Sequence, residues 1–504
     1  MVKQLLTLAF VFSVSGVTVA APAEADYYRL ITLPIPESMV LEVGGLLQLS
    51  DQRIMVATRR GEIFIVENAF SDPPQPVFKR WTFGLSQPLG LAEKDGWIYT
   101  AQRGELTRMK DSDGDDVADR FETVCDDWEI SGNYHEYAFG PRLDKDGYFW
   151  ITLNKPFGGE PYGKAHWRGW AVRVNPKTGK MHPMCVGLRS PAGVEVSPWG
   201  DVFYTDNQGE WCNSSKMSHL EFGDFHGHPH GLHTTKLEAA TIKEPTKVPS
   251  GKYMKDLRKE GIKNFKMPTL WLPYNKMGKS PSGMQWDTSN GKFGPFHGQC
   301  FIADQSNSLV MRGFLEKVNG HWQGAAFPWR EGFSCGLIRI EFATDPKLKA
   351  PSMFGGGSNR GWGTRGGKPW NLERLVWTGK VPFEVHEMSA RSNGFVLTFT
   401  KPVDRAAAGD VASYSLNTYT YKLESRYGGP EADKQNGTIK ATKVSSDGMS
   451  VQLVIDGMRE GYVHELHMKG VKEAKGDALL HSAAYYTLVH LPKAGQVPVK
   501  PSVK

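Results

Sequence analysis

The sequence has few cysteines, and their spacing excludes two common kinds of metal or cofactor attachment. Five cysteines are spread over 504 residues, and no two of them form a CxxC or CxxCH motif. A zinc ribbon and a covalently attached haem both need such spacings, so neither is expected in this chain. The odd number leaves at least one thiol unpaired within the chain, even in an oxidising compartment.

Long apolar runs and a strong net charge are also missing. Beyond the N-terminal segment no stretch approaches 18 apolar residues, so we expect no transmembrane segment once a signal peptide has been removed. The formal net charge of +6 is small for this length and does not indicate a nucleic-acid partner. Hydrophobic residues make up 40% and charged residues 23%, which is typical of a globular protein.

The first 25 residues have the pattern of an export signal. A short basic start, Met1–Lys3, precedes an apolar run from Leu5 to Val19, and Ala23-Glu24-Ala25 offers a small-residue cleavage site. The run is short and interrupted by small polar residues, which favours a cleaved signal over the alternative, an uncleaved anchor. We therefore predict a signal peptide at residues 1–25 and a periplasmic or extracellular protein.

Turn-forming and aromatic residues are abundant. The chain contains 55 Gly and 31 Pro, together with 15 Trp, 17 Tyr and 25 Phe, which favours a β-rich architecture. Short β-like runs recur along the chain at Gln52–Arg59, Gly96–Gln102, Gly147–Asn154, Gly200–Asn207, Gly298–Gln305 and, in a degenerate copy, Pro351–Arg360. A period of about 40–50 residues with several strands per unit is typical of a β-propeller.

The repeats predict a six-bladed β-propeller at residues 26–380. The doubled interval between the fourth and fifth copies is filled by a basic insertion at residues 236–280. This insertion is either a solvated loop or a surface for an anionic partner. A two-sheet sandwich with accidental spacing is the alternative to the propeller.

From about residue 381 the pattern changes to alternating apolar and polar positions. Gly394–Val403, Ser450–Ile455 and Tyr462–His467 show this alternation, and turn residues separate them. The pattern predicts an Ig-like β-sandwich at residues 381–492, followed by a disordered tail at residues 493–504. The expected fold class is all-β: a six-bladed β-propeller followed by a C-terminal Ig-like β-sandwich.

The sharpest local motif is an acidic run at residues 111–122. Its carboxylates fall at positions 1, 3, 5, 9 and 12, and position 7 can offer a carbonyl oxygen. This is the spacing of a calcium loop, in which alternate residues aim oxygens inward. The expected calcium ligands are Asp111, Asp113, Asp115, Val117, Asp119 and Glu122. Asp116 stands where such loops normally have Gly, and a solvated acidic hairpin tip is the alternative.

Other polar residues lie beside the repeat strands. His135 precedes one repeat strand, Arg189 precedes the next, and residues 206–210 follow that next strand. In a propeller the loops at strand ends surround the central channel, so these features are expected to converge there. A histidine-rich loop, His226–His233, is either a transition-metal site or a set of hydrogen-bonding and solvated histidines.

These residues together resemble the soluble quinoprotein glucose/sorbosone dehydrogenase superfamily. The matching segments are His135 with Gly140-Pro141 and Asp146-Gly147, Arg189-Ser190-Pro191 with Gly193, Asp206–Glu210, Phe225–Pro229 and Ser280–Gly283. Asn359–Trp362 and the sequence from Pro382 to Pro492 resemble an exported subgroup common in planctomycetes and verrucomicrobia. The resemblance covers about residues 43–492.

The resemblance implies an exported oxidoreductase that uses pyrroloquinoline quinone (PQQ) and calcium to oxidise a sugar or polyol hydroxyl. His135 would be the general base, and its unperturbed pKa of roughly 6.5 suits that role. The cofactor-binding residues would be Arg189, Ser190, Gly209, Glu210, Arg360 and Arg365, with the carbonyls of Gly209 and Glu210 ligating calcium. Two positions depart from the family pattern: Ser190 replaces an Asn, and Asn154 stands where an Asp orients the base.

Electrons would leave to a separate acceptor such as a cytochrome, since the chain contains no haem-binding motif. Two other functions remain open. A calcium-dependent propeller hydrolase or lyase would need neither quinone nor acceptor. A non-catalytic glycan- or protein-binding propeller would bind without turnover.

Overall fold

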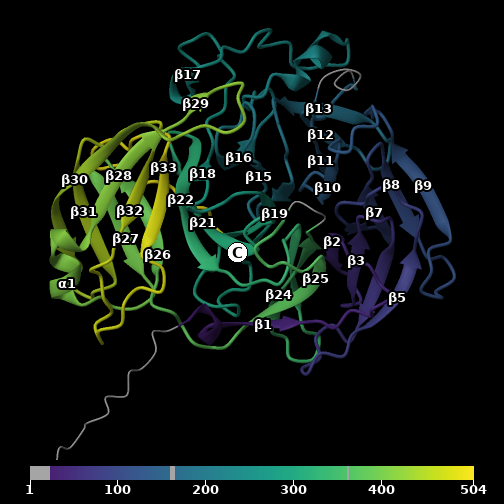
Figure 1. Ribbon diagram of the computed structural model, residues 1–504, viewed down its shortest axis with the longest axis horizontal. Coiled ribbons are helices and arrows are strands. Elements are labelled where there is room, and N and C mark those ends of the chain that lie inside the picture. Colours follow the sequence, from purple (N-terminus) through teal and green to yellow (C-terminus); the bar gives the residue numbers. More distant parts are fainter. Residues whose placement is uncertain (1–22, 159–164, 360–362, 504) are drawn as a thin grey trace, which may run out of the picture.

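The chain folds as a ring of antiparallel sheets with a strand-rich C-terminal region at one side (Figure 1). The computed structural model describes residues 23–158, 165–359 and 363–503. In these ranges the only α-helix is α1 (Arg405–Gly409), and the 3-10 helices are Glu24–Asp26, His230–Lys236, Met254–Asp256 and Val411–Ser413. The predicted all-β class with a propeller is confirmed.

Five sheets have four strands each and are blades of the propeller. The first two contain β2 (Val43–Gln48), β3 (Ile54–Thr58), β4 (Ile63–Glu67) and β5 (Val77–Thr82), then β6 (Ala92–Lys94), β7 (Trp97–Ala101), β8 (Leu106–Lys110) and β9 (Arg120–Cys125). The next two contain β10 (Ala138–Leu143), β11 (Phe149–Leu153), β12 (Trp170–Val174) and β13 (Met181–Val186), then β14 (Gly193–Val196), β15 (Val202–Asp206), β16 (Ser215–Leu220) and β18 (Leu270–Leu272). The last contains β23 (Arg339–Thr344), β24 (Pro351–Ser358), β25 (Trp370–Trp377) and β1 (Tyr28–Thr32).

The predicted repeat runs coincide with the second strand of each blade in chain order. β3, β7, β11, β15 and β24 each lie within one of these runs. The side chains of β3, β11 and β15 are buried along their whole length, because neighbouring blades cover both faces of each sheet. The first strands of adjacent blades contact one another, which places the start of each blade at the centre of the ring.

The sixth set of strands is not a separate sheet. β19 (Pro281–Trp286), β20 (Cys300–Asp304), β21 (Leu309–Val318) and β22 (His321–Arg330) pair in order, but β22 also pairs with β33 (Ala483–Leu488) from the C-terminal region. The prediction of six separate blades is therefore wrong, because five are separate and these four strands belong to an eleven-stranded sheet. β21 and β22 are ten residues long, so β22 presents a long open edge to which another strand can add.

The remaining C-terminal strands continue this eleven-stranded sheet. They are β26 (Val385–Arg391), β27 (Gly394–Phe399), β28 (Ser415–Thr420), β30 (Ala432–Val444), β31 (Ser450–Asp456) and β32 (Tyr462–His467). A separate Ig-like sandwich is thus not confirmed. β30 pairs with β28 through its first half and with β31 through its second half. The region has an apolar core of its own, which also takes in Phe314 of β21 and Phe327 of β22.

The basic insertion and the tail both contact the rest of the molecule. β17 (Lys252–Tyr253) of the insertion pairs with β29 (Lys422–Leu423) of the C-terminal region, and this segment lies at the top of the ring in Figure 1. Leu257 in the insertion is fully buried. In the tail, Val499 exchanges backbone hydrogen bonds of 2.8 and 3.0 Å with Lys317 of β21, a contact that the tail's composition does not indicate.

The N-terminal strand closes the ring. β1 is the outer strand of the last blade and pairs with β25, with Tyr28 opposite Trp377. Just before β1, Glu24 accepts hydrogen bonds from Arg330 Nη1 at 3.2 Å and from the backbone N–H of Glu331 at 2.7 Å. The first described residues are therefore held by side chains from the far end of the propeller sequence.

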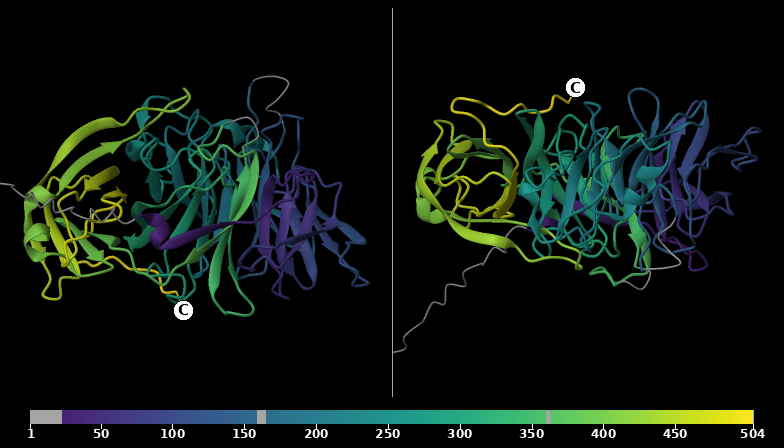
Figure 2. Two further views of the ribbon diagram at one scale, coloured as in Figure 1. Left: turned by 60° about the horizontal axis from the view of Figure 1, so that its bottom comes forward. Right: turned by 90° about the horizontal axis from the view of Figure 1, so that it is seen from above.

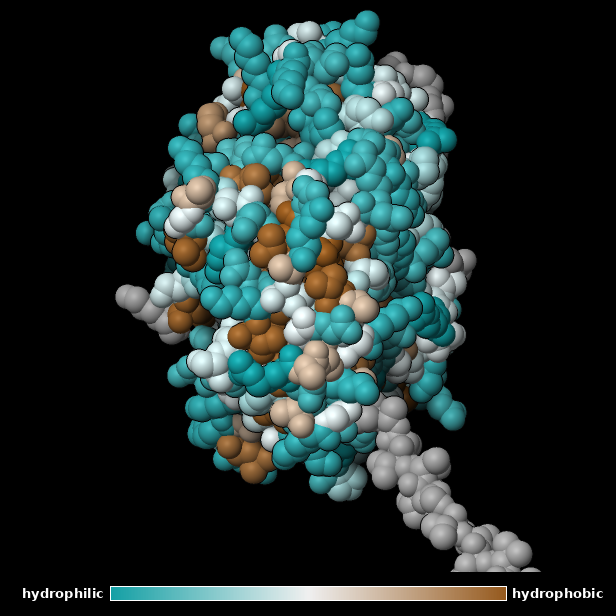
Figure 3. All heavy atoms as spheres, turned by 90° about the vertical axis from the view of Figure 1, so that its left-hand side faces the viewer, coloured by the Kyte–Doolittle hydropathy of each residue, from teal (hydrophilic) through white to brown (hydrophobic). Residues whose placement is uncertain are grey.

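Two further ribbon views show a thick disc with the C-terminal region at one edge (Figure 2). The outer face of that region is mostly hydrophilic, with small groups of apolar residues between (Figure 3). All five cysteines are buried, and none of them forms a disulfide. In the part of the chain that the structure describes, no helix is long and apolar enough to cross a membrane.

Candidate functional site

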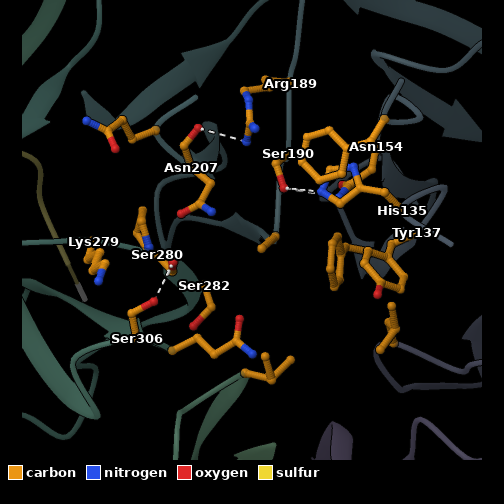
Figure 4. A pocket seen from close by; sticks show the side chains of 18 of the residues that line it. His135, Tyr137, Asn154, Arg189, Ser190, Asn207, Lys279, Ser280, Ser282 and Ser306 are labelled. Atoms are coloured by element: carbon orange, nitrogen blue, oxygen red, sulfur yellow. Dashed lines mark hydrogen bonds between the residues drawn. The ribbon is translucent and has the colours of Figure 1, made fainter. Parts of the chain in front are cut away.

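A cavity of about 380 Å³ lies at the end of the ring where loops enter the first strands and leave the second strands (Figure 4). Its lining residues come from several blades and from the C-terminal region: Arg59, Leu89, Tyr134, His135, Tyr137, Phe139, Asn154, Phe157, Arg189, Ser190, Ala192, Asn207, Gln208, Tyr274, Lys279, Ser280, Pro281, Ser282, Gln305, Ser306, Ile338 and Tyr427. The predicted convergence of His135, Arg189 and the loop after β15 is thus what the structure shows.

One position of the repeat supplies an amide side chain to the cavity from three successive sets of strands. Each of these residues directly follows the strand of its repeat run: Asn154 follows β11, Asn207 follows β15 and Gln305 follows β20. The Oδ1 atoms of Asn154 and Asn207 are buried and accept no hydrogen bond from any residue the structure describes. Buried amide oxygens are rarely left unpaired, so these two point to a ligand that donates to them.

The residue before that amide position fixes the cavity loops. Asp206 accepts the backbone N–H groups of Arg189 and Ser190 at 3.2 and 2.7 Å. Asp304, its counterpart after β20, accepts those of Lys279 and Ser280 at 2.6 and 2.8 Å. Both aspartates are fully buried. A buried aspartate therefore fixes the backbone of two cavity residues in each of these two sets of strands.

His135 is held in one orientation at the wall of the cavity. Its Nδ1 lies 2.7 Å from the carbonyl oxygen of Lys155, and its ring stacks on Phe157 with centroids 3.8 Å apart. A carbonyl can only accept, so Nδ1 carries the hydrogen and Nε2 keeps a lone pair. Burial lowers the pKa of His135 to about 3, and the positive charges of Arg189 and Lys155 act in the same direction. The imidazole is therefore neutral near pH 7.

Ser190 and Asn154 form a chain with His135. Ser190 Oγ lies 3.2 Å from His135 Nε2 and accepts from Asn154 Nδ2, also at 3.2 Å. The sequence had suggested that the residue at position 154 orients the base. The Asn154 side chain instead donates a hydrogen bond to Ser190. That role belongs to the Lys155 carbonyl, which no side-chain pattern reveals.

Arg189 forms the centre of a buried ion cluster. Its Nε and Nη2 donate to Glu210 Oε2 at 3.1 and 2.9 Å, and Lys155 Nζ pairs with the other oxygen of the same carboxylate. Two cations therefore share one carboxylate. Gly209 makes room for this arrangement, since a Cβ there would lie 1.9 Å from Arg189 Nε.

Further cations make the cavity electropositive. Arg59 donates to the Tyr137 hydroxyl at 3.1 Å and lies 4.0 Å from the Glu42 carboxylate. Lys279 lines the cavity, and among the described residues no carboxylate lies within ion-pair distance of its Nζ. Arg189 and Lys155 also carry two positive charges against the single negative charge of Glu210. The cavity therefore favours an anionic ligand.

The structure corrects several predicted cofactor contacts. The carbonyl oxygen of Gly209 already accepts the N–H groups of Cys212 and Gly428 at 3.2 and 3.0 Å, so it is not free to ligate calcium. The Arg365 side chain is exposed, pairs with Glu331 at 2.8 Å and does not line the cavity. Arg360 lies outside the described residues.

The acidic loop lies at the other end of its blade, because successive strands alternate in direction and it joins β8 to β9. Carboxylate oxygens of Asp111, Asp113 and Asp115 lie within 4.8 Å of one another. Asp111 accepts the N–H groups of Gly114 and Asp116 at 2.7 and 3.0 Å. Asp116 adopts φ +67°, so it takes the left-handed turn that such loops usually give to Gly.

Three of the predicted calcium ligands lie outside this trio. Glu122 is on β9, where Arg108 Nε donates to it at 2.8 Å, so the prediction of Glu122 as a ligand is wrong in this arrangement. A strand residue faces its cross-strand partner rather than the loop centre. Asp119 accepts the N–H of Ser112 at 3.0 Å, and Val117 is exposed.

The histidine-rich loop does not gather metal ligands. His226 and His228 are buried, and His228 Nδ1 accepts the N–H of His230 at 3.0 Å. Within the described residues, the acidic trio is the only group of three or more His, Cys, Asp or Glu side chains close enough to share an ion. The transition-metal alternative for this loop therefore has no support in the geometry.

Comparison with known proteins gives the fold but no established activity. The model of a family described as a domain of unknown function, DUF7133, matches residues 55–278. No curated protein matches the sequence. A solved structure from Trichoderma reesei, of Carbohydrate-Active Enzymes Family AA12, has a TM-score of 0.50 at 12% identity, covering 75% of this chain and 100% of its own.

Two PQQ-containing structures also match, with lower TM-scores. The holo PQQ domain of pyranose dehydrogenase from Coprinopsis cinerea has a TM-score of 0.49 at 10% identity, covering 69% of this chain and 95% of its own. PQQ-bound aldose sugar dehydrogenase from Streptomyces coelicolor has a TM-score of 0.47 at 13% identity, covering 71% and 99%. At such identities the likeness concerns the fold alone, and the fold defines this chain as a β-propeller protein.

Proposed function

We propose that this protein is an exported oxidoreductase that binds PQQ in the central cavity and oxidises a hydroxyl of a sugar or polyol. The observation that carries the proposal is the pairing of a neutral, oriented His135 with an excess of cations in one cavity. The likeness of the fold to a carbohydrate-active enzyme of Trichoderma reesei supports the substrate class. Membership of the planctomycete and verrucomicrobial subgroup stays a prediction.

The residues of the cavity fit a planar polyanion. Arg59, Arg189 and Lys279 would hold its carboxylates and quinone oxygens by charge-assisted hydrogen bonds. Phe157 and Tyr137 provide aromatic walls for its flat faces. When bound, the quinone supplies acceptance of the hydride that leaves the substrate carbon.

His135 would take the proton in the same reaction. As the substrate hydroxyl carbon is oxidised to a carbonyl, Nε2 would accept the hydroxyl proton. To reach Nε2, the substrate hydroxyl has to replace Ser190 Oγ, which now lies 3.2 Å away. The imidazolium that forms keeps its Nδ1 hydrogen bond to the Lys155 carbonyl. An anion bound beside Arg189 would offset the charges that now lower the pKa of His135.

The calcium part of the proposal rests on two different places. At the cavity, the amide oxygens of Asn154 and Asn207 are free to face a hard cation, whereas the Gly209 carbonyl is occupied. At the loop, Asp111, Asp113 and Asp115 are close enough together to share one ion. A separate electron acceptor, such as a cytochrome, completes the proposed cycle.

The test is reconstitution of the full chain with PQQ and calcium. We expect the absorbance of the quinone to shift on binding and a sugar panel to reduce an artificial dye. His135→Ala should keep the absorbance shift and lose dye reduction, while His182→Ala, on the outer strand β13, should keep both. Absence of quinone binding at saturating calcium would contradict the proposal.

A hydrolase is the second candidate, favoured by one specific contact. Ser190 Oγ, His135 Nε2 and the Lys155 carbonyl stand in the order of a nucleophile, a base and an orienting group. In a hydrolase Ser190→Ala would abolish ester or lactone cleavage. In the proposed dehydrogenase the same change frees Nε2 and leaves dye-linked turnover within roughly tenfold, far above the loss expected when a general base is removed.

A further inference from the structure

The mouth of the cavity is completed by a loop from outside the propeller. Residues 424–429 follow β29 in the C-terminal region, yet Tyr427 lines the cavity together with residues from the blades. Its ring is 66% exposed and lies 5.1 Å from the Arg189 guanidinium. A large aromatic side chain left open at a cavity mouth is a common mark of a ligand-contacting residue.

This loop is fixed rather than free. Gly428 N–H donates to the Gly209 carbonyl at 3.0 Å, and Gly429 N–H donates to that of Asn213, also at 3.0 Å. On the other side, Trp211 N–H donates to the Glu424 carbonyl at 2.9 Å. The loop that carries Tyr427 is therefore bound along its length to the loop that carries Glu210.

Small residues permit this close approach. A Cβ on Gly429 would lie 2.1 Å from Asn213 Nδ2, and Gly428 adopts φ +65°. The backbone around Tyr427 thus depends on glycine at both following positions. The ring is held at the cavity by backbone contacts of its loop, with Arg189 over one face, and the rest of the ring is exposed.

A second exposed ring belongs to the same mouth. Tyr134, just before His135, is 51% exposed and lies 6.0 Å from Phe157, centroid to centroid. Hydrogen-bonding groups line the same cavity, among them Gln208, Lys279 and Ser306. Exposed aromatic rings in a cavity with polar groups suit a ligand with a flat apolar face and polar edges.

We propose that Tyr427 is a specificity-determining residue that the C-terminal region contributes to the cavity, and that it selects cyclic sugars over open-chain polyols. The ligand class rests on the proposed function. A pyranose ring presents a flat face of C–H groups to an aromatic ring, whereas an open-chain polyol has no such fixed face and loses more conformational freedom on binding. The propeller alone therefore lacks part of its own binding site.

The experiment compares binding with turnover in the full chain. Saturation-transfer NMR with methyl β-glucopyranoside and with sorbitol reports binding without requiring quinone. We expect Tyr427→Ala to weaken glucopyranoside binding roughly 3- to 10-fold and to change sorbitol binding by less than twofold, since aromatic contacts contribute energies of that order. Tyr427→Phe should retain binding. Phe222→Ala, an exposed aromatic beyond the opposite end of β16, is the matched control.

The outcomes separate this inference from the proposed function. If no dye-linked activity is found but glucopyranoside binding depends on Tyr427, the quinone proposal falls and this inference stands. If activity is present and Tyr427→Ala leaves KM and NMR binding unchanged, the inference is overturned while the function stands. Equal preference for the glycoside and sorbitol in the wild-type protein also overturns it.

An independent observation concerns the N-terminal processing site. His481 lies between two carboxylates, 2.9 Å from Glu24 Oε1 and 2.5 Å from Glu384 Oε1. All three side chains are largely buried, and Glu24 is also bound by Arg330 and by the N–H of Glu331. Cleavage after Ala25, at the site predicted from the sequence, would remove Glu24. His481 and Arg330 would then lose that carboxylate as a partner.

We infer that the export signal is cleaved no later than the Ala23–Glu24 bond. Ala21-Pro22-Ala23 has the same small-residue pattern as the later site. Hydrolysis there adds one water across the peptide bond, which leaves a carboxylate on Ala23 and an ammonium group on Glu24. The His481 cluster then stays intact in the mature chain.

Intact-mass measurement and N-terminal sequencing of the exported protein test this inference. A mature chain that begins at Glu24 or earlier, after loss of the basic start and apolar run, is the expected result. A chain that begins at Asp26 or later overturns it, and so does a chain that retains Met1. Glu24→Gln should lower the melting temperature of the mature protein, whereas Glu37→Gln, an exposed position, should not.

Discussion

The cavity and the acidic loop are both rich in charged side chains, but different partners hold those charges. In the cavity, Arg189 is buried and its partners Asp206 and Glu210 lie 17 and 21 residues further along the chain, at the end of β15 and in the loop that follows it. In the loop, Asp111 and Asp115 are held by N–H groups within five residues of themselves. A buried charge needs partners that the fold supplies, whereas an exposed charge is stabilised by solvent and by local turns.

This difference indicates which of the two regions is better suited to bind a reacting ligand. The cavity combines desolvated charges with two unpartnered amide oxygens, so a ligand there meets groups that water does not screen. The loop offers carboxylates that water and backbone already satisfy, so an ion there gains less.

Removal of the base His135 should produce the largest difference between a change in the cavity and a change in the acidic loop. His135→Ala is expected to lower dye-linked turnover by about 10²- to 10⁴-fold, the usual contribution of a positioned general base. Asp113→Ala, in the acidic loop, should leave turnover at saturating substrate unchanged. Steady-state kinetics on both variants measures the contrast. Equal losses would mean that the two regions act as one site.

The loss of stability should be larger when the more buried of two ion pairs is broken. Arg189→Ala is expected to lower the free energy of unfolding by about 3 kcal/mol, because it removes a buried guanidinium and leaves the half-buried Glu210 with Lys155 as its remaining partner. Arg53→Ala removes a partly exposed partner of Asp116 beside the acidic loop and should cost at most about 1 kcal/mol. Urea denaturation measures both values, and a larger loss for Arg53→Ala would reverse the comparison.

Acid should weaken the cavity in a defined pH window. The pKa of His135 is lowered to about 3 in the folded protein, mainly by burial, against roughly 6.5 when unfolded. Between these values the unfolded chain binds more protons, so stability falls as the pH drops from 6.5 toward 3, by up to about 1.4 kcal/mol per pH unit.

The matched variant isolates this contribution among the other buried histidines. His135→Asn cannot take up the proton, so the stability difference between wild type and variant should shrink as the pH falls through this window. Chemical denaturation at a series of pH values gives that difference. A difference independent of pH would show that His135 keeps an ordinary pKa.

Calcium should have the smallest effect, and it should come from the loop. At a free concentration ten times Kd, an ion bound only to the folded state adds about 1.4 kcal/mol of stability. Chelation should therefore lower the melting temperature of the wild type more than that of Asp113→Ala, while Arg189→Ala should still respond. If chelation affects Asp113→Ala as much as the wild type, calcium is bound elsewhere.

The sequence predicted the elements with a local signal and missed those that depend on distant partners. Six runs of apolar residues with a regular period placed the inner strands, because each such strand is buried on both faces whatever follows it. The pairing of β22 with β33 has no such signal, since it depends on a strand about 160 residues later. Six separate blades were therefore expected where five are found.

The candidate site was predictable to a similar extent. His135 and Arg189 were found because they stand next to repeat strands. The same position of the repeat could also have revealed Asn207 and Gln305, had the copies been compared column by column. Tyr427 could not have been found, because only the folded chain brings residues 424–429 to the cavity.

Closure of the ring by β1 has a consequence for the order of events during synthesis. Thr32 of β1 donates to Glu373, a residue 341 positions later in the chain. At translation rates of 5–20 residues per second, roughly 20 to 70 s separate the appearance of these two residues. Throughout that interval the last blade does not exist and β1 is an unpaired strand, which is a common starting point for aggregation. The ring can therefore close only after β25 has been synthesised.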